Sequence, residues 1–341
     1  MQLSYAQNLE DYHLDLLFAG QDTGTYVDVG GGHPVADNVS FWFYLAGWHG
    51  LVVEPQQALA DIYAHVRPRD RAVSCLAGRA EGEAEFHVVD RLHGFSTTVR
   101  EHAAGTGQFG TGFTTIVKPV RTLAALIGEA GLTTIDFLKI DVEGAEADVL
   151  AGMDFARWRP RVVLVEAVAP GSMAETWGTW EPDLLAHGYR FAFFDRLNRF
   201  YVAEEAQDLA ARFPAEPAAW DSVKHLWDCG RAPERADHPD HKLAQALQQG
   251  LFAELPSLDP ALLRRLIERG LDGVRPHGPG RTQVTDGALG SDPTAALLGT
   301  AEFPRTAREP AADLAALLRT DQLRAALGRI ASMYDGGHLL E

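Results

Sequence analysis

The chain has 341 residues and a formal net charge of −17, with 30 Lys and Arg against 47 Asp and Glu. This length suits one large domain or two unequal ones, and a hydrophobic share of 46% is typical of a folded protein. The acidic balance, with no local basic stripe, excludes nucleic acid as an expected partner and favours small-molecule or sugar chemistry.

The expected location is the cytoplasm. Cys75 and Cys229 are too few for a disulfide scaffold, which favours a reducing compartment. The first residues lack the features of a secretory signal, and no run approaches the ~18 apolar residues that a membrane helix needs. We therefore expect no membrane span.

From Thr25 onward, short apolar runs alternate with amphipathic stretches, which predicts an α/β fold of parallel strands joined by helices. The glycine-rich segment 94–115 is predicted to be a mobile surface loop over a binding site. Apolar runs around a polar turn predict an antiparallel hairpin over 189–202. The other predicted strands are 26–29, 51–53, 71–76, 84–89, 135–140 and 162–165, and the predicted helices are 38–46, 58–64 and 145–150.

Beyond residue 213 this alternation stops and the chain becomes rich in Ala and Leu. Helices are predicted at 259–270, 311–318 and 322–332, with a Gly/Pro-rich linker over 271–293. The pattern indicates a first domain over 1–213 and a mostly helical region of unknown role over 214–341. The helices of this second region are candidates for pairing two copies of the chain.

A glycine turn follows the first predicted strand in the sequence Asp28-Val-Gly-Gly-Gly-His-Pro34. Glycine permits a sharp turn or close approach of a ligand, and the N-terminus of a following helix suits an anionic group. A dinucleotide fingerprint requires a third glycine where Val35 stands, so a tight turn without a ligand remains an alternative. Glu54 ends the next strand and can accept both hydroxyls of a ribose, which together with the turn predicts a nucleoside-containing cofactor.

A third motif, Phe137-Leu-Lys-Ile-Asp-Val-Glu-Gly-Ala-Glu146, places Asp141 and Glu143 at the end of a buried strand. With the motifs around it, in order along residues 4 to 213, the sequence resembles FkbM-type methyltransferases. The other motifs of the series are Gln7-Asn-Leu-Glu-Asp11, the Asp28 turn with Pro34, Gly47-Trp-His-Gly50, Val52-Val-Glu-Pro55, Gly188-Tyr-Arg-Phe191 and Leu197-Asn-Arg-Phe-Tyr-Val202.

The resemblance implies a class I methyltransferase fold, with a Rossmann-like sheet of seven strands, mostly parallel with one antiparallel hairpin strand. It also implies S-adenosylmethionine as cofactor and, usually, methyl transfer to a hydroxyl oxygen. The cofactor contacts it implies are Asp28 and Gly30 near the methionine part, Glu54 on the ribose, and Gln7, Asn8, Asn38 and Asp141. The sequence departs from the commoner family pattern at Leu9 and at Gly31, Gly32 and His33, so the detailed contacts of the glycine turn stay open.

Methyl transfer needs alignment of acceptor, methyl and sulfur, and a group that removes the acceptor proton. Asp141 and Glu166 end neighbouring strands, so both are predicted to face the methyl group. They would act as a general base with its orienting partner, or as ligands of a divalent cation such as Mg²⁺. The alternative is that Asp141 bonds the cofactor and Glu166 caps a helix or pairs with an arginine. His93 is a further candidate base, although an exposed histidine in a turn is common.

The leading hypothesis is an S-adenosylmethionine-dependent O-methyltransferase that acts on a hydroxyl of a sugar, glycan or secondary metabolite. A second hypothesis is a scaffold module that keeps the cofactor pocket without catalysis. A third is a nicotinamide-dependent oxidoreductase, which Glu54 supports and Val35 weakens.

Overall fold

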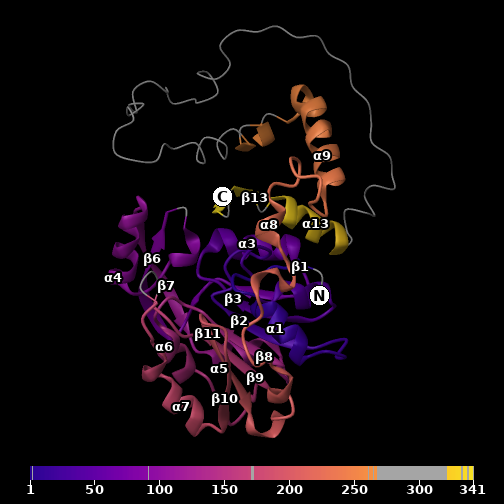
Figure 1. The fold of residues 1–341 in the computed structure, drawn as a ribbon. Helices are drawn as coiled ribbons and strands as arrows, with labels where there is room; N and C mark the ends of the chain where they lie inside the picture. The colour runs from indigo at the N-terminus through magenta and orange to yellow at the C-terminus, as the bar shows by residue number, and fades with distance from the viewer. Residues whose placement is uncertain are drawn as a thin grey trace.

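The computed structural model describes all residues except 2, 91, 170–172, 260, 264, 267–320, 332, 336–337 and 341. Its central element is a seven-stranded sheet in the order β10-β11-β9-β8-β2-β3-β4 (Figure 1). Neighbouring strands run parallel from β4 to β9, and β11 is antiparallel to both β9 and β10. The predicted class I sheet is confirmed. Its strands are β2 (Thr25–Val29), β3 (His49–Val53), β4 (Arg71–Val73), β8 (Phe137–Ile140), β9 (Val162–Glu166), β10 (Tyr189–Phe194) and β11 (Asn198–Ala203).

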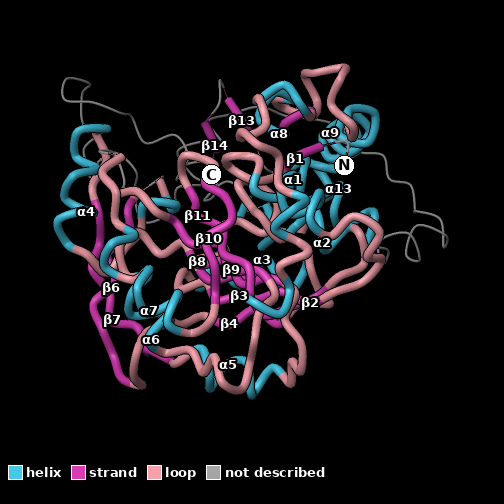
Figure 2. The backbone as a smooth tube through the Cα atoms, turned by 60° about the horizontal axis from the view of Figure 1, so that its bottom comes forward, coloured by secondary structure: helices cyan, strands magenta, loops and turns pink. Residues whose placement is uncertain are grey.

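The inner strands are apolar because both faces of the sheet are covered. Val27 of β2 pairs with Leu51 of β3 and Leu138 of β8, and all three side chains are fully buried. Figure 2 shows these strands in the interior with helices around them. The helices of this part of the chain are α1 (Glu10–Leu17), α2 (Phe41–Leu45), α3 (Gln57–Val66), α5 (Leu123–Ala130), α6 (Glu146–Ala151) and α7 (Glu181–Ala186).

A second sheet of three strands, in the order β5-β7-β6, corrects two predictions. The predicted strand 71–76 is divided between β4 and β5 (Leu76–Ala77), which belong to different sheets. The predicted loop 94–115 contains the 3-10 turns His93–Phe95 and Thr106–Phe109, helix α4 (Arg100–Gly105) and the start of β7 (Phe113–Arg121). Strand β6 (Gly82–Val89) pairs with β7 in antiparallel register, from Gly82 opposite Val120 to Val89 opposite Phe113, so the segment between them connects two paired strands.

The predicted helix 38–46 is reduced to the five residues of α2. Asn38 and Ser40 use their side chains in hydrogen bonds to the glycine turn and to Asp28, so this end of the segment forms a loop. The polar residues before α2 therefore position the turn that follows β2.

The described part of the C-terminal region packs against the first 213 residues. Strand β12 (Lys224–His225) pairs in parallel with β1 (Leu3–Ser4), and α8 (Leu226–Cys229) follows it. Helix α13 (Asp321–Ala331), which confirms the predicted helix 322–332, contacts α2 and α3. A Cβ at Gly328 would lie 2.6 Å from Cγ2 of Val35, which shows how closely α13 approaches. The domain boundary at 213 stays a prediction.

The remaining C-terminal elements are α9 (His241–Glu254) and the short strands β13 (Met333–Asp335) and β14 (His338–Leu340). The Asp259 carboxylate accepts from the backbone N–H of Ala261 and Leu262, as predicted for a helix start. The predicted helix 311–318, the linker 271–293 and the end of the helix at 259–270 lie outside the described residues.

Helix α9 exposes Leu247, Leu251 and Phe252. The association of two copies through the C-terminal helices stays a prediction. None of the helices in the described part of the chain is long and apolar enough to cross a membrane.

Candidate active site

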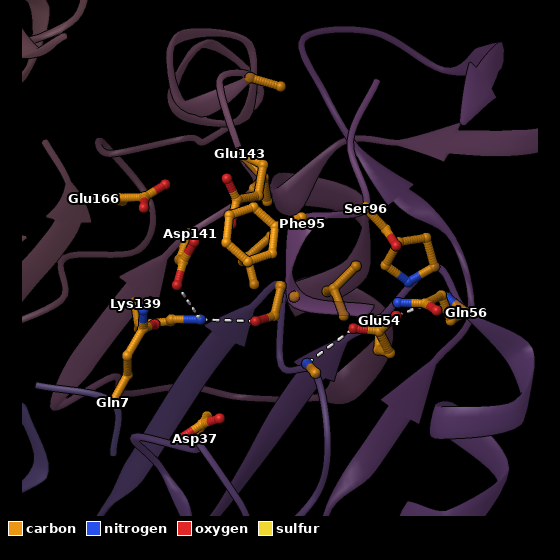
Figure 3. A pocket seen from close by; sticks show the side chains of 18 of the residues that line it. Gln7, Asp37, Glu54, Gln56, Phe95, Ser96, Lys139, Asp141, Glu143 and Glu166 are labelled. Atoms are coloured by element: carbon orange, nitrogen blue, oxygen red, sulfur yellow. Dashed lines mark hydrogen bonds and ion pairs between the residues drawn. The ribbon is translucent and has the colours of Figure 1, made fainter. Parts of the chain in front are cut away.

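A cavity of about 460 Å³ lies at the carboxyl ends of β8, β2 and β3, where ligands bind in open α/β sheets. Of the residues predicted to form the site, Gln7, Gly30, Glu54, Asp141 and Glu166 line this cavity. In Figure 3, Asp141, Glu143 and Glu166 lie together on one side of it, and Glu54, Gln56 and Ser96 on the other. Side chains that are 159 residues apart in the sequence, from Gln7 to Glu166, therefore meet at one sheet edge.

The glycine turn forms the floor of the cavity. Gly30 has φ +74, and a Cβ there would lie 1.7 Å from the carbonyl oxygen of Asp141, so this position admits only glycine. Gly32 has φ +56, and a Cβ there would meet no described atom within 4 Å, so its backbone faces open space. The turn thus presents bare main chain to whatever occupies the cavity.

Glu54 is held rigidly at the end of β3. Its Oε2 accepts from the N–H of Gly32 at 2.8 Å, and its Oε1 accepts from the N–H of Gln56 at 2.7 Å. Its two carboxylate oxygens are therefore fixed at the edge of the cavity, where a carboxylate can accept from the hydroxyls of a ribose.

Asp28, Asn38 and Asn8 are not among the residues that line the cavity, and their direct contacts with a cofactor stay a prediction. Asp28 is buried and its Oδ2 accepts from Ser40 Oγ at 2.6 Å. Asn38 donates to the carbonyl oxygens of Gly31 and His33, so it supports the glycine turn from behind. Asn8 donates to the carbonyl oxygen of Asp195 at 3.0 Å. Their polar side chains are thus used in hydrogen bonds within the protein.

Arg67 anchors this supporting layer, and no motif in the sequence pointed to it. Its guanidinium is fully buried and donates to Asn38 Oδ1 and to Ser40 Oγ, each at 2.8 Å. It also pairs with the buried carboxylate of Asp70 at 2.6 Å. The glycine turn is therefore tied through Asn38 to a buried ion pair.

Lys139 connects the glycine turn to the acidic side of the cavity. Its Nζ donates to the carbonyl oxygen of Gly30 at 2.7 Å and lies 3.4 Å from Asp141 Oδ2 and 3.6 Å from Asp28 Oδ1. Burial opposes the charge of Lys139, but Asp141 and Asp28 outweigh that effect and raise its pKa above the ordinary value. Lys139 therefore serves as the fixed cation of the site.

Asp141, Glu143 and Glu166 form an acidic cluster whose carboxylate oxygens lie within 4.8 Å of one another. Burial, followed by the neighbouring charges of Asp141, Glu143 and Glu146, raises the pKa of Glu166 well above its ordinary value. Burial and Asp141 likewise raise the pKa of Glu143. Burial and the mutual repulsion of these carboxylates therefore favour the protonated forms of Glu143 and Glu166.

Glu143 has an unusual backbone conformation for a residue other than glycine, with φ +58. Its Oε2 is buried and has no hydrogen-bond partner among the described residues. Its carbonyl oxygen accepts from Thr97 Oγ1 at 2.8 Å and lies 3.0 Å from His102 Nδ1, so the segment before and within α4 fixes this turn. Strained residues of this kind are concentrated at functional sites.

The segment before α4 also covers the cavity, with Phe95, Ser96 and Thr98 in its lining. His93, the other predicted base, begins the 3-10 turn His93–Phe95, and its side chain lies outside the described part of the structure. A catalytic role for His93 stays a prediction.

Several cavity residues were not among the predicted site residues. Lys139 and Glu143 belong to the quoted motif 137–146, so their position in it was a usable signal. Trp227 carried no such signal, because its place depends on the pairing of β12 with β1. The other lining residues of this kind include Asp37, Gln56, Cys75, Phe95 and Ser96.

A second pair of buried carboxyls fixes the N-terminal segment beside the cavity. Glu10 Oε1 accepts from Asn198 Nδ2 at 2.7 Å, and Glu10 Oε2 accepts from the N–H of Asn8 at 2.6 Å. Burial and the charge of Asp195 raise the pKa of Glu10 to about 8, and burial raises that of Asp195 to about 6. Glu10 therefore takes up a proton on folding at neutral pH.

Glu10→Gln is expected to flatten the pH dependence of stability. Between the ordinary pKa of 4.5 and the folded value of about 8, the folded state binds more protons at Glu10 than the unfolded state. Stability therefore falls as pH rises through this window, by up to about 1.4 kcal/mol per pH unit for one proton. Urea unfolding between pH 5 and 9 measures the slope. An unchanged slope in the variant would contradict the assignment, and the exposed Glu175→Gln is the control.

Residues 28–191 match the family model described as the Methyltransferase FkbM domain. Residues 28–191 are therefore similar to an FkbM methyltransferase domain, and a methyltransferase domain implies S-adenosylmethionine as the methyl donor. Neither the comparison with curated proteins nor the comparison with solved structures gave a match.

The residues present fit such a donor. A volume of about 460 Å³ falls within the range of small-molecule sites. The bare backbone of Gly32 and the carboxylate of Glu54 suit a nucleoside, and the acidic cluster suits a positively charged sulfur.

Proposed function

We propose that this protein transfers a methyl group from S-adenosylmethionine to a hydroxyl oxygen of a sugar, glycan or secondary metabolite. The observation that carries the proposal is the buried carboxyl of Glu166, which has a raised pKa and lines the same cavity as Gly30 and Glu54. A proton acceptor next to a nucleoside site is the arrangement that O-methylation requires.

The residues of the site have separate tasks in this proposal. Glu54 would hold the ribose hydroxyls, while Gly30 and Gly32 allow the donor to lie against the main chain. When bound, S-adenosylmethionine supplies an activated methyl group on a positively charged sulfur. Glu166 accepts the proton of the acceptor hydroxyl. Asp141, which is held by Lys139, orients the Glu166 carboxyl.

The charge of the site selects against anionic acceptors. Asp141, Glu143 and Glu166 gather within 4.8 Å of one another, with Lys139 as their paired cation among the described residues. A phosphate or carboxylate on the acceptor would be repelled there. A neutral polyol is the acceptor that this field admits.

The cation predicted on Asp141 and Glu166 stays a prediction. Oxygen ligands from three carboxylates would suit Mg²⁺, but a retained proton accounts for the close approach of these groups equally well. We expect turnover to survive treatment with a chelator, because Glu166 can accept the proton without a metal.

The experiment uses donor labelled in its methyl group and a panel of neutral, anionic and amine acceptors. We expect label on the oxygen of neutral hydroxyl compounds, located by mass spectrometry of the products. Label on nitrogen or on anionic acceptors would contradict the proposal, as would donor binding without turnover on any acceptor. Activity that is lost with chelator and restored by Mg²⁺ would assign the acidic cluster to a cation.

A further inference from the structure

We propose that the segment Lys224–Cys229, which lies outside the matched methyltransferase domain, completes the donor pocket, with Trp227 as a positioning residue for Asp37. Asp37 and Gln7 would hold the amino-acid end of the methyl donor. This inference rests on the proposed use of S-adenosylmethionine.

Trp227, Asp37 and Gln7 all line the cavity, and Gln7 and Asp37 lie on the same side of it, which we call the amino-acid wall (Figure 3). The indole Nε1 of Trp227 donates to Asp37 Oδ1 at 2.6 Å, a short bond from a neutral donor to a carboxylate. Asp37 also has a backbone φ of +51, in the left-handed region that Asp and Asn adopt more readily than most other residues. The hydrogen bond from Trp227 is part of what holds Asp37 in place.

The segment that carries Trp227 is anchored to both sides of this wall. Strand β12 pairs with β1, so that His225 lies opposite Ser4. Ser4 is three residues before Gln7. The fully buried Leu226 packs in one cluster with Tyr5, Val35 and Phe41. The segment therefore fixes at once the strand that leads to Gln7 and the loop that carries Asp37.

The side chains at this end of the cavity carry groups that can bind the ammonium and carboxylate of an amino acid. Gln7 and Asp37 lie on the same side as Lys139, away from Gln56 and Ser96 (Figure 3). A carboxylate attracts an ammonium group, and an amide can donate to a carboxylate. S-adenosylmethionine carries both groups on its methionine part, whereas its adenosine part would lie toward Glu54 and Gln56.

Two ligands distinguish binding of the amino-acid end of the donor from binding of its adenosine end. S-adenosylhomocysteine carries the amino-acid group, and 5′-methylthioadenosine lacks it. Trp227→Ala and Asp37→Asn are each expected to weaken binding of S-adenosylhomocysteine about tenfold or more, the effect of losing one hydrogen bond to a charged group. Binding of 5′-methylthioadenosine should change less than about threefold. Isothermal titration calorimetry on the full chain measures both ligands.

Matched variants keep the test independent of folding. Trp158→Phe removes another indole N–H, which donates to the carbonyl oxygen of Leu132 at 3.2 Å; Trp158 is not among the described cavity-lining residues, so this variant should bind both ligands as the wild type does. Asp37→Asn preserves shape, and asparagine tolerates the left-handed backbone region. Trp227→Phe keeps the apolar wall but loses the N–H, so it should behave like Asp37→Asn.

Equal weakening of both ligands, or no weakening of either, would overturn the assignment of Trp227 and Asp37 to the amino-acid end. A wild-type protein that binds neither ligand would overturn the proposed function itself, which is a distinct result.

Discussion

Glu166→Gln is expected to lower kcat by about 10²–10⁴-fold, the usual contribution of a positioned general base. The amide keeps the shape of the side chain but cannot accept the hydroxyl proton. Binding of S-adenosylmethionine should change little, because Glu54, the proposed ribose acceptor, lies on the other side of the cavity (Figure 3). Steady-state kinetics together with donor titration separate the two effects.

The pH profile of the same variant tests the role of Glu166 more closely. A base must be unprotonated to act, and burial with neighbouring carboxylates raises the pKa of Glu166 well above its ordinary value. Wild-type kcat should therefore rise with pH through this raised value, not near 4.5, and the rise should be absent in Glu166→Gln. Glu175→Gln makes the same charge change at an exposed position nearby and should leave kcat unaltered. A variant of Glu166 with wild-type kcat would exclude it as the base.

Arg67→Ala is expected to destabilise the fold by about 3–5 kcal/mol, the cost of removing one partner from a buried ion pair. The substitution leaves the carboxylate of Asp70 buried, and among the described residues its remaining donors are the hydroxyl of Tyr26 and the N–H of Gly50. It also removes the donors to Asn38 and Ser40, so the glycine turn loses its support.

Urea unfolding measures this loss. Arg71→Ala is the matched control, because its side chain is 47% exposed and its ion pair with Glu129 is 3.4 Å long. Exposed pairs of this kind contribute about 0–1 kcal/mol. A similar loss in both variants would contradict a special role for the buried Arg67 pair.

The central sheet was predictable from the sequence because its strands are short apolar runs that end in glycine or acidic residues. Val162–Glu166 is buried along its whole length, so its pattern is continuous and not alternating. The same regularity placed Gly30, Glu54, Asp141 and Glu166 at one edge. Because neighbouring parallel strands end at the same edge of a sheet, this placement could be predicted without knowledge of side-chain contacts.

The second sheet was not predictable in the same way. Glycines at 105, 107 and 110 interrupt any pattern, and Pro119 argues against a central strand. In the structure Pro119 pairs with Glu83 on one side, while β5 pairs with β7 only at the next two residues. Pro119 therefore lies at a position of β7 that pairs with β6 but not with β5.

Direct contacts were harder to predict than the sheet edge. Asp28 and Gly30 are two residues apart, yet only Gly30 lines the cavity, because Asp28 is directed to Ser40 and Lys139. Trp227 reaches the amino-acid wall through pairing between strands more than 200 residues apart. Long-range pairing of two-residue strands leaves no pattern in the local sequence.

Donor binding is tested most directly by isothermal titration calorimetry of the purified full chain with S-adenosylmethionine. We predict saturable binding at one site per chain, and Glu54→Ala should weaken it because the variant loses the predicted ribose acceptor. Absence of binding to S-adenosylmethionine, with binding of a nicotinamide dinucleotide in its place, would contradict the assignment of this cavity to a methyl donor.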